Sequence, residues 1–307
     1  MKISVIIPTH NAGQTLPGLL KAVRRQTVPC EIIVVDSFST DDTARIASSF
    51  DAAVKGVGQG GFGHGSARNL GWKAAAGDVI VYLTQDAVPA DDHAITRLTA
   101  CLGNRDIAAV FGRQLPQLGC GPFGAHVRLF NYPEKSRIVT LADRERFGIR
   151  TPFFSNSFGA YRRDALDEIG GFDERVIMGE DVCAAGRLLL KGYSIAYAAE
   201  AAVYHSHDYT ALGEFRRYFD IGVFHATEAW LAESFGRAEG EGMRYLRAEA
   251  RFLADKGRFL LMPVFLWRNA MKYAGYVLGK NHRMLPRRLA GIMSMHRAWW
   301  RREKQGS

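Results

Sequence analysis

The chain has 307 residues, 47% of them hydrophobic, which suffices for one large domain with an appendage or for two domains and excludes a disordered chain. No run of about eighteen apolar residues occurs, so we expect no transmembrane helix. The net charge of +9 comes entirely from the later part of the chain: residues 1–210 hold 22 basic and 22 acidic residues, and residues 211–307 hold 18 and 9.

The N-terminal apolar run and the cysteines bear on the cellular compartment. The run is short and is broken by Pro8, so it predicts neither a signal peptide nor a membrane span. The cysteines Cys30, Cys101, Cys120 and Cys183 show no CxxC spacing, which disfavours a zinc or redox motif. We therefore expect reduced thiols and a cytoplasmic location.

Short apolar runs alternate with segments of helical spacing over roughly the first ninety residues. The predicted strands are residues 3–7, residues 31–35, a short strand at Val54, and residues 79–83. The predicted helices are residues 15–25, 39–47 and 66–76, followed by a helix that opens at 89–92. This alternation predicts βαβ units and a mostly parallel α/β sheet with flanking helices.

A glycine-rich loop is predicted over residues 56–65. Its core, GQGGFG at residues 58–63, is not followed by GK[ST] and does not follow the first strand. It is therefore neither a P-loop nor a dinucleotide-binding fingerprint.

The remaining chain is less regular and then becomes helical. The irregular pattern of residues 112–157 predicts loops, which we expect to lie over a ligand site, and one helix near 123–131. Further on, the pattern predicts helices at 164–170 and 181–190, short strands at 194–198 and 202–204, and mostly helices from about residue 212.

Polar residues stand at or just past several predicted strand ends. Asn11, Asp36 and Asp86 occupy such positions, and ligands of parallel sheets bind outside the carboxyl ends of the strands. Asp181 opens a predicted helix, and His205 follows a predicted strand. Each residue alone could be a helix cap or an ordinary surface side chain, but together they could form a metal-binding site with a general base.

Four motifs, taken in order, carry a resemblance to a known family. Residues 5–11 (VIIPTHN), 33–37 (IVVDS), 67–71 (ARNLG) and 82–86 (YLTQD) resemble motifs of family-2 glycosyltransferases, which have the GT-A fold. The resemblance covers roughly residues 1–210, leaving 211–307 as a basic helical extension. Residues 204–209 (YHSHDY), 217–220 (RYFD) and 279–282 (GKNH) resemble bacterial rhamnosyltransferases that use dTDP-L-rhamnose.

The resemblance implies an inverting transfer of a sugar from a nucleotide-sugar to a glycan or a lipid-linked glycan in cell-surface polysaccharide synthesis. It implies Asp181 as the catalytic base, and Asp86 with His205 as ligands of Mg²⁺ or Mn²⁺. His207 is a second candidate ligand, and we assign Glu180 to the acceptor. The implied donor-binding residues are Pro8, Thr9, Asn11, Asp36, Arg68, Asn69, Gln85 and Asp86.

Two details refine these expectations. Thr84 stands where the family often has aspartate, which leaves Asp86 as the only carboxylate of its motif. Asp181 is expected at a helix N-terminus, where the helix dipole would keep it ionised.

Three other functions compete with this one. The donor could be a UDP-sugar, or the chain could be a catalytically dead scaffold at a membrane. A nucleotidyltransferase would need a basic, glycine-rich loop after the first strand, and THNAG at residues 9–13 does not provide one.

The C-terminal region is strongly basic. Residues 256–307 hold 12 basic residues against Glu303 alone. The apolar run at 259–267 is too short to cross a bilayer. Together with the basic residues that follow, this run predicts a helix lying on an anionic membrane surface. We expect peripheral association with the inner face of the plasma membrane; the alternative is a pair of core helices with a solvated basic face. No nucleic-acid motif occurs, so we expect no nucleic-acid partner.

Overall fold

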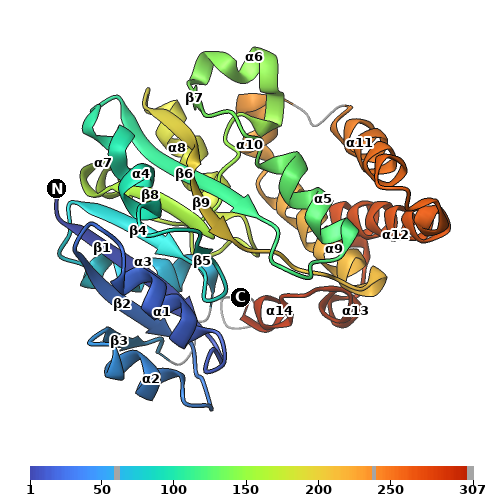
Figure 1. Cartoon of the computed structure of the whole chain (residues 1–307). Coiled ribbons are helices and arrows are strands. Elements are labelled where there is room, and N and C mark those ends of the chain that lie inside the picture. The colour runs from blue at the N-terminus through green and yellow to red at the C-terminus, as the bar shows by residue number, and fades with distance from the viewer. Residues whose placement is uncertain (59–62, 237–239, 303–307) are drawn as a thin grey trace.

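One mixed sheet forms the centre of the computed structural model, which describes residues 1–58, 63–236 and 240–302 (Figure 1). The strands are β1 (Ile3–Thr9), β2 (Cys30–Asp36), β3 (Ala53–Gly56), β4 (Val79–Leu83), β5 (Val88–Pro89), β6 (Ile107–Leu115), β7 (Arg137–Val139), β8 (Phe158–Arg162) and β9 (Ser194–Tyr204).

The sheet order is β3-β2-β1-β4-β8-β6-β9-β5, with β7 pairing to β9. β8 is antiparallel to both of its neighbours, β4 and β6, so these two neighbours run in the same direction. Within the described residues, β1, β2, β3, β4, β6 and β9 share one direction, which confirms the mostly parallel sheet.

Helices cover both faces of this sheet. They are α1 (Leu16–Arg24), α2 (Thr43–Ser49), α3 (His64–Ala74), α4 (Ala94–Thr99), α5 (Pro122–Asn131), α6 (Arg144–Phe147), α7 (Arg163–Glu168), α8 (Glu180–Leu190), α9 (Ala211–Thr227), α10 (Ala229–Phe235), α11 (Glu241–Asp255), α12 (Met262–Lys280), α13 (Arg287–Met293) and α14 (Arg297–Arg302). Five short 3₁₀ segments also occur in the described chain: Ala100–Gly103, Leu141–Asp143, Gly148–Arg150, Phe259–Leu261 and His282–Met284.

Alternating strand residues supply two separate cores. On β1, Val5 and Ile7 pack with Leu19 and Leu20 of α1. Ile6 belongs to the other core, which also contains residues of α3, α7, α8 and α9. Since successive side chains of a strand point to opposite faces, one buried strand serves both layers.

The sequence prediction missed two central strands. β6 and β8 lie at the middle of the sheet, whereas we expected loops from residue 112 and no strand at 158–162. The two short strands predicted at 194–198 and 202–204 form one strand, β9, whose register with β6 shifts between Gly112 and Arg113. Helix α5 confirms the helix predicted near 123–131. Part of the predicted glycine-rich loop, residues 59–62, lies outside the described residues.

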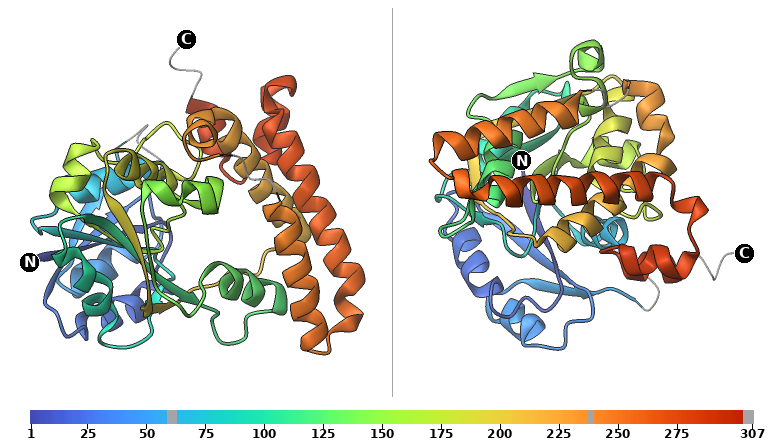
Figure 2. Two further views of the ribbon diagram at one scale, coloured as in Figure 1. Left: turned by 90° about the horizontal axis from the view of Figure 1, so that it is seen from above. Right: turned by 90° about the vertical axis from the view of Figure 1, so that its right-hand side faces the viewer.

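The C-terminal helices pack against the sheet and against each other (Figure 2). Phe219 and Val223 of α9 belong to the same core as Ile6 of the sheet. α9 and α12 approach closely because glycines of α12 lie against the backbone of α9. A Cβ at Gly279 would overlap the Phe219 carbonyl oxygen. Residue 210, the predicted domain boundary, immediately precedes α9, and the division into two domains stays a prediction.

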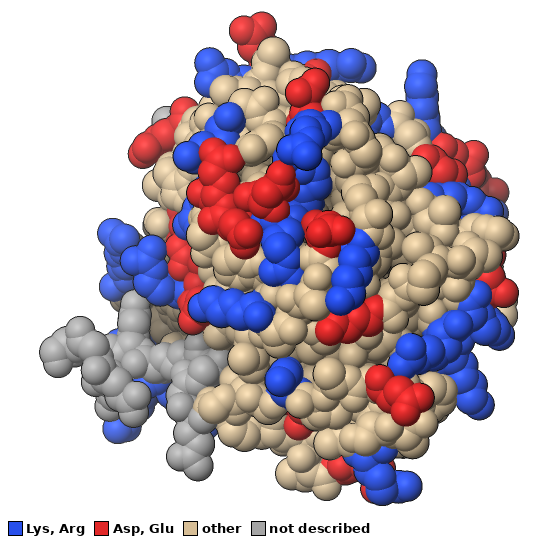
Figure 3. Space-filling model, turned by 90° about the vertical axis from the view of Figure 1, so that its left-hand side faces the viewer, with Lys and Arg blue, Asp and Glu red and all other residues tan. Residues whose placement is uncertain are grey.

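The excess of basic residues lies at residues 211–307 of the sequence. Figure 3 shows the face that is on the left in Figure 1, where acidic and basic side chains are interspersed. Among the described residues, no helix is both long and apolar enough to cross a membrane.

We expect Gly279→Ala to lower the free energy of unfolding by about 1–3 kcal/mol, because the added methyl group must push α9 and α12 apart. Urea denaturation measures this change. Gly242→Ala on α11 is the matched control: its Cβ would meet open space, so stability should hold or rise by up to about 1 kcal/mol. Equal stabilities of the two variants would contradict the close-packing account.

Candidate active site

Polar side chains gather at one edge of the sheet because the parallel strands end there. β1 ends at Thr9, β2 at Asp36 and β4 at Leu83, shortly before Asp86. β8 runs the other way, so Phe158 at its start lies opposite Leu83, and the preceding residues reach the same edge. Reversal of one central strand thus adds a further segment to the site.

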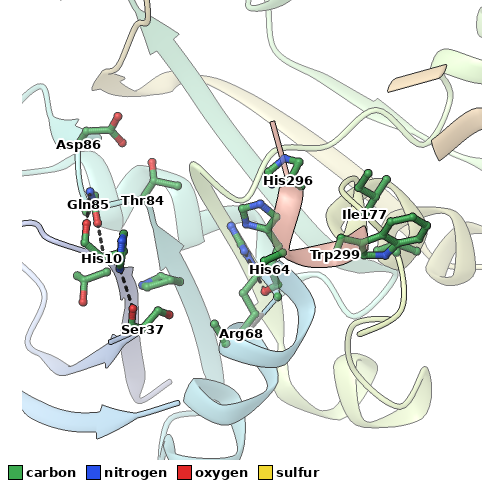
Figure 4. Close-up of a pocket in the computed structure, with 16 residues that line it drawn as sticks. His10, Ser37, His64, Arg68, Thr84, Gln85, Asp86, Ile177, His296 and Trp299 are labelled. Carbon is green, nitrogen blue, oxygen red and sulfur yellow. Dashed lines mark hydrogen bonds between the residues drawn. The ribbon is translucent and has the colours of Figure 1, made fainter. Parts of the chain in front are cut away.

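A cavity of about 310 Å³ opens at this edge (Figure 4). Pro8, Thr9, Arg68, Gln85 and Asp86, five of the predicted donor-binding residues, line it. Other lining residues are His10, Ser37, His64, Ile177, His296 and Trp299.

Hydrogen bonds tie the strand ends at this cavity together. The His10 backbone N–H donates to Gln85 Oε1 at 2.8 Å, and Gln85 Nε2 donates to the His10 carbonyl at 3.3 Å. The His10 ring shares a 2.7 Å contact with the Ser37 carbonyl, which can only accept, so Nδ1 carries the proton. β1, β2 and the segment after β4 are thereby held in register (Figure 4).

Three predicted donor-binding residues do not line the cavity. Asn11, in the left-handed conformation at φ 49°, accepts a hydrogen bond from the Thr40 backbone N–H at 2.9 Å. Asp36 accepts hydrogen bonds from the backbone and hydroxyl groups of Ser39. Both residues shape the loop after β2, next to the cavity residue Ser37.

The third, Asn69, is buried and fully engaged elsewhere. Its Nδ2 donates to the Phe172 carbonyl at 2.9 Å and to Glu174 Oε1 at 2.8 Å, while its Oδ1 accepts from the Phe172 backbone N–H. Asn69 therefore joins α3 to the segment that precedes α8.

Asp86, His205 and His207 come together as a potential metal-binding group. Asp86 Oδ1 lies 3.4 Å from His205 Nε2, and Asp86 Oδ2 lies 3.6 Å from His207 Nε2. All three ligand atoms lie within 4.8 Å of one another. His207, which the sequence offers as a second candidate ligand, lies beside Asp86 together with His205. One carboxylate and two imidazoles suit Mn²⁺ and related ions, with a bias away from Mg²⁺, which prefers oxygen ligands alone.

Gln114, buried at 1% exposure, orients the His205 ring through the nitrogen that does not face Asp86. His205 Nδ1 lies 2.8 Å from Gln114 Oε1, which also accepts from Arg128 Nη1 at 2.7 Å. Because a guanidinium can only donate, the contact with Arg128 identifies this Gln114 atom as the oxygen. His205 must then donate from Nδ1, so its Nε2 faces Asp86 and can carry either a proton or a metal ion. An outer hydrogen bond of this kind is typical of metal-binding histidines.

The local charges also suit a cation. Burial alone would raise the pKa of Asp86, but the hydrogen bond and charge of His205, followed by the charge of His207, lower it to about 2. Burial, with His205 as the second cause, lowers the pKa of His207 to about 4. Near neutral pH the group therefore offers an ionised carboxylate and a neutral His207 ring.

Glu180, predicted at the acceptor, forms a buried ion pair in this structure. Its Oε1 lies 3.2 Å from Arg68 Nη1, and their side chains are 5% and 7% exposed. Arg68 also donates to the His64 carbonyl at 3.0 Å. Arg68 thus links Glu180 to the cavity, and an acceptor role of Glu180 stays a prediction.

Asp181 is the second residue of α8, directly after Glu180, and lines neither this cavity nor a second one between α5, α9 and α12. Its carboxylate accepts from the backbone N–H groups of Asn156 at 3.0 Å and Val182 at 2.9 Å. The expectation that the helix dipole keeps Asp181 ionised is wrong. Burial, followed by the negative charge of Glu180, raises its pKa to about 7.

The segment before β8 connects Asp181 with the metal-binding group. Ser155, next to Asn156, accepts a 2.8 Å hydrogen bond from Gln114 Nε2, and Gln114 holds His205. The candidate base and the candidate ligands therefore lie at the same end of the sheet, joined through one short segment.

The C-terminal segment contributes a wall of the cavity, which the sequence did not predict. Asp220 of α9 accepts hydrogen bonds from the backbone N–H groups of Met295 and His296 at 2.8 and 3.3 Å. The His296 ring meets His64 edge to face at 4.8 Å. Trp299 Nε1 donates to the Arg175 carbonyl at 2.7 Å. No local pattern marks these residues, because their partners are far away in the sequence.

Comparison with known proteins identifies the family. The model of Glycosyl transferase family 2 matches residues 4–170. The chain is 44% identical over 303 residues to the O-antigen chain rhamnosyltransferase RfbN of Salmonella typhimurium, covering 98% of this chain and 96% of the relative. It is 41% identical to the O-antigen chain rhamnosyltransferase WbaN of Salmonella anatum, covering 97% and 95%.

Solved structures support the fold. The mannosyltransferase PcManGT from Pyrobaculum calidifontis, in complex with GDP-Man and Mn²⁺, aligns with a TM-score of 0.64 at 20% identity, covering 91% of this chain and 87% of that one. Residues 1–349 of Staphylococcus aureus TarS align with a TM-score of 0.58 at 20% identity, covering 100% and 92%. The predicted GT-A fold class is confirmed, and the chain belongs to glycosyl transferase family 2.

Proposed function

We propose that this chain transfers L-rhamnose from dTDP-L-rhamnose, with inversion, to a hydroxyl group of a glycan acceptor. The names and full-length similarity of the two Salmonella relatives support the sugar and its use in O-antigen synthesis. The observation that carries the proposed chemistry is the Asp86–His205–His207 group at the rim of a cavity formed by strand ends.

Asp86 and His205, with His207, would hold a divalent cation. Such an ion, when bound, stabilises the negative charge that develops on a diphosphate leaving group. Gln114 fixes the His205 ring so that the protein contributes a preset ligand direction. Mn²⁺ bound to the similar PcManGT structure supports this choice of ion.

The cavity is proposed to hold the nucleoside part of the donor. Pro8, Thr9 and Ser37 line its strand-end side, and His296 and Trp299 close the opposite side. An aromatic wall gives a planar base a stacking surface.

Asp181 is the proposed base that removes the proton from the acceptor hydroxyl. A base is most effective when its pKa lies near the working pH, and burial beside Glu180 gives Asp181 such a value, about 7. Glu180 is proposed to set this value while Arg68 holds its carboxylate in place.

The outer face of α12 is proposed to rest on a membrane whose lipids carry the acceptor. An exposed apolar stripe on this face consists of the neighbours Leu266 and Trp267, followed at intervals of three or four residues by Ala270, Tyr273 and Val277. Trp267 and Tyr273 are exposed by 61% and 72%. Leu260, exposed by 94%, precedes the stripe, and Lys280 ends it. Apolar and aromatic side chains flanked by cations suit an anionic interface.

Purified chain with Mn²⁺ should transfer rhamnose from dTDP-L-rhamnose to an O-antigen-type glycan, and Asp181→Asn should abolish transfer while keeping dTDP affinity.

In Glu180→Gln, loss of the adjacent negative charge should lower the pKa of Asp181. Since the base must be ionised, activity falls as pH drops through this pKa, so the acid limb of kcat/KM should move about one unit lower. An active Asp181→Asn variant, or an unshifted acid limb, would contradict the assignment of the base.

Trp299→Ala should weaken dTDP binding about tenfold, because the ring contributes a stacking surface worth about 1–3 kcal/mol. Isothermal titration calorimetry in Mn²⁺ measures the affinity. Trp267→Ala, the same change on the outer face of α12, is the control and should bind as the wild type does. Equal affinities of all three proteins would mean that the C-terminal wall takes no part in nucleotide binding.

Leu266→Glu should reduce binding to vesicles of phosphatidylglycerol and phosphatidylcholine severalfold, since a carboxylate replaces an apolar contact at an anionic surface. Flotation measures the bound fraction. Ile138→Glu on β7 is the control, because Ile138 has a comparable exposure, 57% against 65% for Leu266, but lies outside α12. Equal losses in both variants, or none in Leu266→Glu, would exclude the stripe as the membrane contact.

A further inference from the structure

A second cavity, of about 180 Å³, lies between α5, α9 and α12. His207 and Tyr209 line one part of it, where the chain leaves β9. Because His207 lies 3.6 Å from Asp86, and Asp86 lines the first cavity, the two cavities border the same metal-binding group. A group bound in the second cavity would lie on the far side of His207 from the nucleotide.

Four cationic side chains line this cavity: Arg128, Arg217, Arg268 and Lys272. Glu214 is the single carboxylate among the lining residues described. Arg268 pairs with Glu214 at 2.8 Å, and Lys272 lies 3.5 Å from the same carboxylate.

Lys272 has one further anionic neighbour, Glu249, at 3.6 Å behind the cavity. Glu249 is fully buried and also accepts hydrogen bonds from Tyr245 and Asn269. Two carboxylates therefore face four cations. Positive charge remains in excess around the cavity even after every described ion pair there is counted.

The excess charge belongs chiefly to two guanidinium groups. Arg128 Nη1 donates to the neutral amide oxygen of Gln114, and Arg128 Nε is buried without a hydrogen-bond partner. Arg217 lies over the Tyr209 ring at 5.8 Å. Among the described contacts, no carboxylate pairs with either Arg128 or Arg217.

We propose that this cavity binds a phosphate ester of the acceptor, the group through which a glycan is joined to its lipid. The inference rests on the proposed function, which supplies a lipid-linked acceptor. Guanidinium groups match phosphate oxygens with paired N–H donors, and a partly buried site strengthens such contacts.

Helix α12 gives this assignment a spatial reason. Its inner residues Arg268 and Lys272 line the cavity, while its outer residues Leu266 and Trp267 belong to the exposed apolar stripe. A lipid anchored beneath the stripe and a phosphate held in the cavity would thus meet opposite faces of one helix. The sugar end of the acceptor would extend towards the metal-binding group beside His207.

The donor diphosphate is the other possible source of a phosphate group, and two titrations separate the sources. A soluble prenyl diphosphate is titrated in EDTA, and dTDP is titrated in Mn²⁺, each into the full-length chain. Arg217→Gln removes one unpaired cation from an exposed side chain, and Val127→Phe reduces the cavity without changing charge. Arg216→Gln, the same charge change outside both cavities, is the control.

We expect Arg217→Gln and Val127→Phe to weaken prenyl diphosphate binding about five- to tenfold, while dTDP binding and the Arg216→Gln control stay at wild-type values. Unchanged prenyl diphosphate binding in both variants would overturn the proposal. A loss of dTDP affinity as large as the loss of prenyl diphosphate affinity would also overturn it, by assigning the cations to the donor. Failure of the proposed function would give a different result from failure of this proposal. In that case the wild-type chain would bind no dTDP, while the prenyl diphosphate titration could still be measured.

Discussion

The buried side chain of Gln114 holds the site together. Its oxygen accepts from His205 and Arg128, and its amide group donates to Tyr132 and Ser155. These contacts join β6 to β9, to α5 and to the segment before β8. Because every polar atom of the amide is used inside the protein, losing it would leave several buried groups without partners, which costs about 1–3 kcal/mol for each. The candidate ligand His205, the segment that holds the candidate base Asp181 and the cationic cavity therefore share one positioning residue.

Topology explains why these groups meet. A wholly parallel sheet would bring only strand ends to this edge, but the reversed strand β8 also brings the residues before Phe158. Through Asn156, that segment holds Asp181 beside Glu180, where burial and like charge raise the pKa of Asp181. The C-terminal segment is held against α9 through Asp220 and closes one side of the cavity that is proposed to hold the nucleotide. The basic extension thus contributes to the cavity as well as to the proposed membrane surface.

Local sequence patterns predicted the first half of the fold well. The strand expected at 79–83 occurs with the same bounds, because a short buried run before a polar strand end is a local signal. Gln114 was missed together with its strand, since its role depends on partners up to 91 residues away. The charge state expected for Asp181 failed for a related reason: a helix dipole can be inferred from sequence, but burial beside Glu180 cannot. His296 and Trp299 were interpreted only as part of a basic tail.

We propose that Asp86, His205 and His207 together hold the cation that meets the donor diphosphate. Crystals of the chain soaked with Mn²⁺ and dTDP test it most directly, through anomalous scattering from manganese. We expect a peak bonded to Asp86 and to His205 Nε2 at about 2.0–2.3 Å, with the nucleotide in the first cavity. A manganese peak bonded to the nucleotide but to none of these three side chains would contradict it.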